Sequence, residues 1–102
     1  MRVAVTVWED RISPVFDASR RLLIAEMKHG RVTHRSNLIF DPGHPASLAN
    51  TLDQLGVPVL ICGAISQVPA NTITAEGISL IPFVTGEVNR VLRAYARGQS
   101  LA

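Results

Sequence analysis

Apolar and polar residues alternate with the period of a β-strand at the start of this chain. The segment Arg2–Trp8 is rich in valine and alternates with a period of two, which predicts a strand that is buried on at least one face. Two further strands are expected at 22–27 and 31–40, because His29-Gly30 between them is a typical hairpin turn. The first half of the chain is therefore predicted to be an antiparallel meander.

The segment Glu9–Arg20 interrupts this meander and is predicted to be a loop. It contains Pro14 and mixes polar with apolar residues, so neither period continues through it. Val15 and Phe16 are large apolar residues in a polar stretch, and at least one of them must fold back onto the sheet. We expect Phe16 to be an internal plug.

The second half of the chain alternates helical and strand patterns. Pro45 suits the first position of a helix, leucines follow at helical spacing, and Gly56 can end that helix in a left-handed conformation. The other expected elements are strands at 57–62 and 78–82, a helix that Ser66 caps and that ends near Gly77, and a last helix from Thr85 or Gly86 to Gly98.

This βββαβαβα order predicts the α/β class, with one mixed five-stranded sheet. Numbered along the chain, the strands are expected in the order 3-2-1-4-5 with helices on both faces, since each αβ unit adds a parallel strand through a right-handed crossover. The loop 9–20 and the turn 62–66 would then share one edge, called the rim below, where ligands of open α/β sheets bind. At 102 residues the chain is expected to be a single domain, 1–102.

Composition and charge limit the classes of function. Apolar residues make up 47 % of the chain and no apolar run approaches the roughly 18 residues that span a bilayer, so no membrane partner is expected. The net charge is +2, Lys and Arg are absent from 36 to 89, and no basic stripe with interleaved aromatics points to nucleic acid. A single cysteine excludes an intrachain disulfide, and Glu9 and Asp10 come too early for a signal peptide, so the cytoplasm is the expected location.

Cys62 is the first candidate for chemistry, because it follows a buried strand and precedes a helix. A thiolate is a soft ligand for iron–sulfur clusters, and a helix start lowers the pKa of a thiol. The alternative is a buried cysteine that acts as a small hydrophobic residue. If Cys62 is a ligand, its sulfur must be partly accessible beside Gly63.

His44 lies between Gly43 and Pro45, just before a predicted helix, and is the second candidate. Its imidazole can bind iron, cap the helix or remain solvated. His34 on an edge strand and His29 in the hairpin turn are expected to be ordinary surface residues.

The turn Gly63–Ser66 offers backbone N–H groups at a helix start, which is a weak signal for an anion site. The strand order also suits nucleases of the ribonuclease H type, but neither 3–7 nor 59–62 contains the carboxylate that such enzymes need for their metals. No catalytic pair is visible, so we expect a protein that is not an enzyme.

Several motifs together resemble the nitrogenase iron–molybdenum cofactor biosynthesis family. In order along the chain these motifs are Ile12-Ser13-Pro14-Val15-Phe16-Asp17, the strand 22–26, Gly43-His44, Leu60-Ile61-Cys62-Gly63-Ala64-Ile65, Gly77-Ile78 and Tyr95-Ala96-Arg97-Gly98. Two departures are Ser66, where the family often has glycine, and Asp17, whose charge would oppose an anionic cluster.

The resemblance implies a ribonuclease H-like fold without a nuclease site, and a carrier of iron–molybdenum cofactor or an iron–sulfur precursor. Such a carrier would exchange its cluster with donor and acceptor proteins. Cys62 and His44 would be the metal ligands, with Gly63 and Ser66 at the cluster. Three arginines would balance the charge of the cluster: Arg11, Arg20 and Arg21. The alternatives are an interaction module without a cluster, or an enzyme acting on a small anion.

Overall fold

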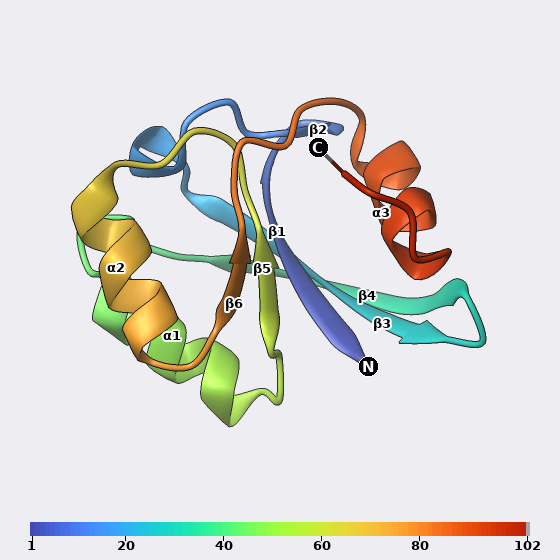
Figure 1. Cartoon of the computed structure of the whole chain (residues 1–102), viewed down its shortest axis with the longest axis horizontal. Helices are drawn as coiled ribbons and strands as arrows, with labels where there is room; N and C mark the ends of the chain where they lie inside the picture. The colour runs from blue at the N-terminus through green and yellow to red at the C-terminus, as the bar shows by residue number, and fades with distance from the viewer. Residues whose placement is uncertain (102) are drawn as a thin grey trace.

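The computed structural model describes residues 1–101 and shows a mixed sheet with helices packed on it (Figure 1). The strands are β1 (Arg2–Trp8), β2 (Arg11–Ile12), β3 (Arg21–Lys28), β4 (Arg31–Ile39), β5 (Val59–Ile61) and β6 (Ser79–Ile81). The helices are α1 (Pro45–Gln54), α2 (Gln67–Ala75), α3 (Val88–Ala96) and a short 3₁₀ turn, η1 (Phe16–Ala18). The predicted α/β class is confirmed.

The sheet has six strands, so the expectation of five is wrong. The additional strand, β2, lies inside the predicted loop 9–20 and pairs antiparallel with the end of β1. It escapes prediction because a two-residue strand carries no measurable period. The longer strands follow the order β4-β3-β1-β5-β6. The specific likeness to ribonuclease H stays a prediction.

Strand directions change across β1. Its pairing with β3 is antiparallel, whereas its pairing with β5 is parallel, and β6 continues parallel to β5. The hairpin of β3 and β4 turns at His29-Gly30 as predicted, and both residues have a positive φ, of 53° and 74°.

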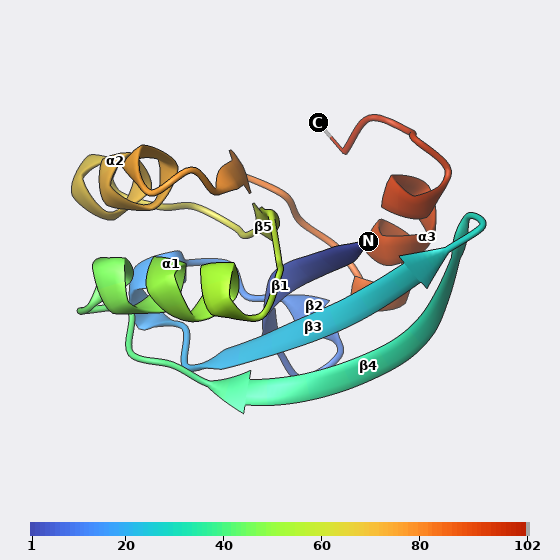
Figure 2. The same ribbon diagram turned by 90° about the horizontal axis from the view of Figure 1, so that it is seen from below.

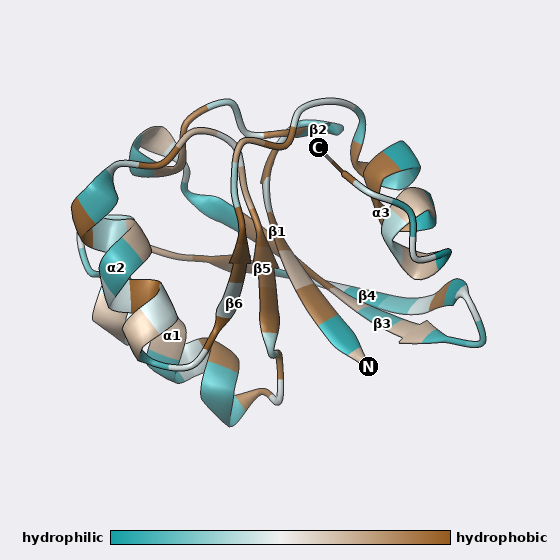
Figure 3. Cartoon of the chain, viewed as in Figure 1, coloured by the Kyte–Doolittle hydropathy of each residue, from teal (hydrophilic) through white to brown (hydrophobic). Residues whose placement is uncertain are grey.

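Two apolar clusters lie on opposite faces of the sheet. One contains Val3, Val5 and Ile61 and packs under α3, and the other contains Ala4, Leu60 and Cys62 and packs under α1 and α2. Figure 2 shows α3 well separated from α1 and α2. Helices on both faces explain why β5 is apolar along its whole length, as Figure 3 shows.

Element ends differ slightly from the expected ones. The helix predicted from Thr85 or Gly86 begins at Val88, and the helix predicted to end near Gly77 ends at Ala75. The strand expected at 57–62 is shorter, Val59–Ile61. These differences leave Cys62 and Ser66 outside regular elements, in the turn between β5 and α2.

Candidate functional site

The loop 9–20 folds onto the turn after β5 through a two-residue parallel bridge. The backbone N–H of Phe16 donates to the carbonyl of Ala64 at 2.7 Å, and the N–H of Ala64 donates to the carbonyl of Pro14 at 2.9 Å. Phe16 is fully buried, which confirms the predicted plug, and its ring centroid lies 5.6 Å from that of Phe40. The rim is therefore a closed structure rather than an open cleft.

Gly63 is the residue that permits this close approach. A Cβ at that position would overlap the carbonyl oxygen of Ser13 and would lie 2.5 Å from the carbonyl oxygen of Pro14. Gly63 was predicted to lie at the cluster, beside an accessible Cys62 sulfur. In the structure the missing side chain makes room for the protein's own backbone.

The N-terminus of α2 is occupied by a carboxylate of the same chain. Asp17 accepts a hydrogen bond from the backbone N–H of Ser66 at 3.3 Å and another from its hydroxyl at 3.1 Å. Ser66 stands at the N-cap position as predicted, but its side chain does not cap the helix. Ser66 was expected to lie at the cluster, but in the structure its N–H and its hydroxyl both donate to Asp17.

Cys62 is sealed in the core, so the expectation of a partly accessible sulfur is wrong. Its exposed fraction is 0 %, and it belongs to the cluster that also contains Phe16. The reason is that its side chain lies on the face of the sheet that α1 and α2 cover, where it packs with Phe16 of the loop 9–20 and with Ile73 of α2. Burial, and secondarily the charge of Asp17, raises the pKa of the Cys62 thiol to about 12. Near neutral pH this cysteine is a neutral thiol.

Thr6 lies beside Cys62 on the same face of the sheet. Strands β1 and β5 pair Val5 with Ile61, so Thr6 and Cys62 are the next residues in register. Within residues 1–101 the buried hydroxyl of Thr6 has no hydrogen-bond partner. The Thr6 hydroxyl and the Cys62 thiol are thus neighbours among mostly apolar residues.

His44 is exposed and is oriented by a carboxylate. Its Nδ1 lies 3.0 Å from Oδ2 of Asp41, and the side chain is 73 % exposed. The backbone N–H of Gly43 donates to the other oxygen of Asp41 at 2.8 Å. This bond, and after it the His44 ring, holds the pKa of the Asp41 carboxyl below its ordinary value. Because an ionised carboxylate can only accept, Nδ1 carries the proton in this pair.

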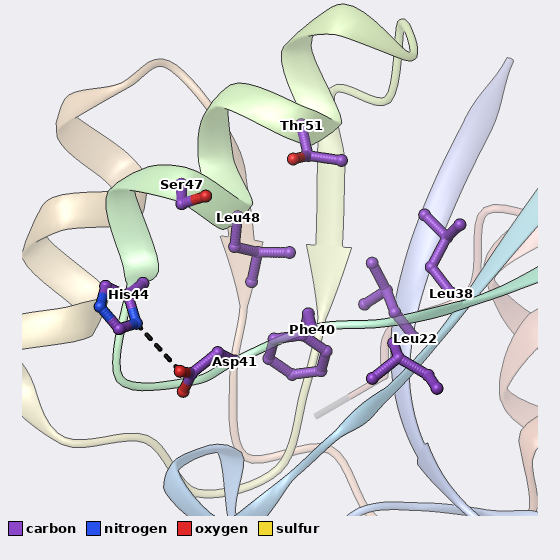
Figure 4. Close-up of a pocket in the computed structure, with 9 residues that line it drawn as sticks. Leu22, Leu38, Phe40, Asp41, His44, Ser47, Leu48 and Thr51 are labelled. Carbon is purple, nitrogen blue, oxygen red and sulfur yellow. Dashed lines mark hydrogen bonds and ion pairs between the residues drawn. The ribbon is translucent and has the colours of Figure 1, made fainter.

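His44 lies at the mouth of a cavity of about 280 Å³, shown in Figure 4. Apolar side chains from the strands and from α1 form its floor, among them Leu22, Phe40 and Leu48. Cys62 is not among its lining residues. The structure therefore does not bring the two predicted ligands to one cavity.

The three arginines proposed to balance cluster charge are exposed and separately placed. Arg11 belongs to β2, and its neighbours in the sheet are Trp8 and Glu87. Arg20 donates to the carbonyl of Ser19 at 3.1 Å, and Arg21 begins β3. Their exposure is compatible with the predicted role, which stays a prediction.

The family model described as dinitrogenase iron-molybdenum cofactor matches residues 1–98. The chain belongs to this family. No curated protein sequence matches it at a significant level.

Solved structures of low sequence identity share the fold of this family member. A Methanocaldococcus jannaschii protein described as a dinitrogenase candidate is 20 % identical with a TM-score of 0.77, over 97 % of this chain and 90 % of its own. The apo form of the orange protein from Desulfovibrio gigas is 20 % identical with a TM-score of 0.70, over 99 % and 92 %. A Thermotoga protein described as a NifB candidate is 23 % identical with a TM-score of 0.70, over 96 % and 89 %.

One feature of the rim in this family member was not predicted, an exposed apolar surface. Trp8, Val15 and Phe83 are 60 %, 43 % and 68 % exposed, and Phe83 has a positive φ of 62°. Trp8, Val15 and Pro14 line a shallow cavity of about 360 Å³. The sequence signal for this surface was the pair of large apolar residues Val15 and Phe16 in the loop 9–20. Of the two, only Phe16 was given a predicted position, inside the core.

The described residues contain no ready-made metal site. Nowhere between positions 1 and 101 do three His, Cys, Asp or Glu side chains gather closely enough to hold an ion. In the same part of the chain, no helix combines the length and the apolar character required to cross a bilayer.

Proposed function

We propose that this protein is a non-catalytic carrier of an iron–sulfur-type metallocluster, either iron–molybdenum cofactor or a precursor of it. Membership of the dinitrogenase iron-molybdenum cofactor family supports the cluster class. The cluster is cargo, received from a donor protein and passed to an acceptor protein. A single accessible ligand suits such exchange, since few bonds must break at each transfer.

The observation that carries the proposal is the Asp41–His44 pair. A metal-binding histidine commonly donates its second ring N–H to a carboxylate, which fixes the tautomer and the ring orientation. Here Nδ1 bonds Asp41, so in the neutral ring Nε2 keeps its lone pair for a metal ion. The ring is exposed at the mouth of a cavity, where a bulky cluster can reach it.

Cys62 does not fit as a ligand in the conformation described. A thiol with a pKa of about 12 is not a thiolate at neutral pH, and the sulfur is covered. Ligation by Cys62 requires the loop 9–20 to leave Gly63 and Asp17 to release Ser66. In our proposal His44 attaches the cargo first, and Cys62 contributes only if the rim opens.

A second candidate function is an interaction module without a cluster. The exposed Trp8, Val15 and Phe83 favour it, because aromatic residues are enriched at the centres of protein interfaces. On this alternative the rim docks directly on a partner of the cluster pathway, and His44 has no role.

The test is anaerobic reconstitution with ferrous iron, sulfide and an excess of a small thiol, which supplies the other cluster ligands. After gel filtration, bound iron and visible absorbance are measured for the wild type, His44→Ala and Cys62→Ala. His34→Ala is the matched control, since His34 is an exposed histidine on β4. The carrier proposal expects iron in the wild type and the control, and a large loss with His44→Ala. Iron-free wild-type protein would favour the interaction module.

A further inference from the structure

A β-bulge between β3 and β4 turns Arg35 toward α3. Glu26 pairs with His34 whereas Met27 pairs with Val32. Thr33 is therefore an extra residue of β4 that has no opposite residue on β3. Arg35 consequently pairs with Ala25, which belongs to the apolar cluster under α3. In a regular ladder His34 would occupy that place and Arg35 would face the opposite side.

Helix α3 presents a matching polar row. Asn89 and Arg93 are four residues apart, so they share one face of the helix, and Arg97 follows directly after its last residue at the C-cap. With Arg31 and Arg35 of β4 they line a cavity of about 290 Å³. Figures 1 and 2 both show the tip of the β3–β4 hairpin beside α3.

Four arginines thus surround one hollow, and no acidic residue lines it. The ion pairs found among the described residues involve only Arg2 with Glu26 and His44 with Asp41. Cations near the end of α3 suit the helix dipole, which accounts for Arg93 and Arg97 taken alone. The helix dipole does not account for Arg31 and Arg35, which β4 contributes to the same hollow although like charges repel.

The chemistry of the lining selects a compact polyanion. Guanidinium groups bind phosphate oxygens in a bidentate manner, and Asn89 can donate its amide N–H groups. No aromatic side chain lines the hollow, so it offers no platform on which nucleic-acid bases stack. Its volume is at the small end of ligand sites, which suits two linked phosphates better than a macromolecule.

We propose that the hollow between β4 and α3 is a binding site for a diphosphate group. The site is separate from the His44 cavity, which the other end of β4 helps to line through Ile39. The proposal does not rest on cluster binding. Two sources offer the same chemistry, free pyrophosphate and the diphosphate of a nucleotide.

The test is calorimetric titration of the whole protein with pyrophosphate, ADP, orthophosphate and a short single-stranded oligonucleotide. The variants are Arg35→Gln, Arg93→Gln and Arg35→Lys, with Arg90→Gln as the matched control. Arg90 is an exposed arginine of α3 that does not line the hollow. All of these side chains are exposed, and a thermal unfolding curve of each variant verifies that it folds.

We expect pyrophosphate to bind more tightly than orthophosphate, and salt to weaken it. Loss of Arg35 or Arg93 should weaken it roughly tenfold or more, as for other charge-assisted hydrogen bonds, while Arg90→Gln changes it little. Arg35→Lys keeps the positive charge but loses the bidentate geometry of the guanidinium group. Its affinity for pyrophosphate should therefore lie between those of the wild type and Arg35→Gln. If ADP binds as tightly as pyrophosphate, the diphosphate site is supported and its ligand is a nucleotide. If ADP binds more weakly, the site is supported and its ligand is free pyrophosphate.

Three results would overturn the proposal. The first is no pyrophosphate binding by the wild type at millimolar concentration. The second is an effect of Arg90→Gln as large as that of Arg35→Gln, which would indicate attraction to overall charge. The third is tighter binding of the oligonucleotide than of pyrophosphate, which would make the hollow part of a nucleic-acid surface.

Discussion

The carboxylate of Asp17 accepts two hydrogen bonds from Ser66, which lies 49 positions further along the chain. Its carboxylate lies where the partial positive charge at the start of α2 favours an anion. An anionic cluster that approaches Ser66 therefore competes with a carboxylate already held there. This contact, together with Gly63, keeps the rim closed over Cys62.

Replacing Asp17 with alanine should loosen the rim. The lost hydrogen bonds at the helix start should lower the free energy of unfolding by about 0.5–2 kcal/mol, as for other capping residues. The pKa of Cys62 should also fall, because the charge of Asp17 contributes to raising it. Urea unfolding and thiol titration measure the two effects. Asp53→Ala, an exposed aspartate of α1, is the control, and equal effects in both variants would contradict this role of Asp17.

The buried thiol of Cys62 should make stability fall at alkaline pH. Its pKa rises from an ordinary value of 9.0 to about 12 on folding, so between these values the unfolded chain loses the proton first. The stabilising contribution is fully present below pH 9 and declines above it by at most about 1.4 kcal/mol per pH unit. Urea unfolding from pH 8 to 11 measures the decline.

Cys62→Ala lacks this titrating group and is the reference for that experiment. Tyr95, whose pKa is also raised by burial, titrates in both proteins and cancels in the difference. If the wild type and Cys62→Ala lose stability in parallel, the thiol is not buried in solution and the sealed rim is wrong.

Gly63→Ala should disrupt the contact between the turn and the loop 9–20. Backbone atoms of Ser13 and Pro14 leave no space for a Cβ, and backbone yields less readily than a side-chain end. We expect a loss of about 1–3 kcal/mol, typical of overpacking. Thermal or urea unfolding tests this against Gly43→Ala, whose new Cβ would lie 3.2 Å from the side chain of Asp41. Equal stability of the two variants would disprove the tight approach.

Phe16→Ala should cost about 3–5 kcal/mol, as expected when a fully buried phenylalanine leaves a cavity. Its neighbour Val15 is 43 % exposed, so Val15→Ala should cost much less. Urea unfolding of both variants compares them directly. A cost below about 1 kcal/mol for Phe16→Ala would mean that the plug leaves the core in solution.

The pattern of apolar and polar residues alone predicted most of the longer strands and helices. This works because the spacing of the apolar residues depends on which face of the strand or helix is buried. The valines of β1 and the leucines of α1 are examples. The bulge at Thr33 was not predictable in the same way. It alters which side Arg35 faces, and that depends on pairing with β3 rather than on any local pattern.

The candidate site was harder to predict, because it depends on contacts between distant segments. The exposed position of His44 before a helix follows from its neighbours Gly43 and Pro45. The burial of Cys62 depends on packing against Phe16 from the distant loop 9–20 and against the helices α1 and α2, and no nearby residue signals it. Glycine after a strand was interpreted as access for a ligand, whereas Gly63 gives access to the backbone of Pro14.

The central claim, that His44 attaches a metallocluster, is tested most directly by pulsed electron paramagnetic resonance of the reconstituted, reduced protein. A histidine ligand transfers unpaired spin density to its nitrogen, and the spectrum reports that coupling. We predict a nitrogen coupling in the wild type that persists in Cys62→Ala and His34→Ala and disappears in His44→Ala. An unchanged nitrogen coupling in His44→Ala, or a paramagnetic cluster without any such coupling in the wild type, would contradict the account.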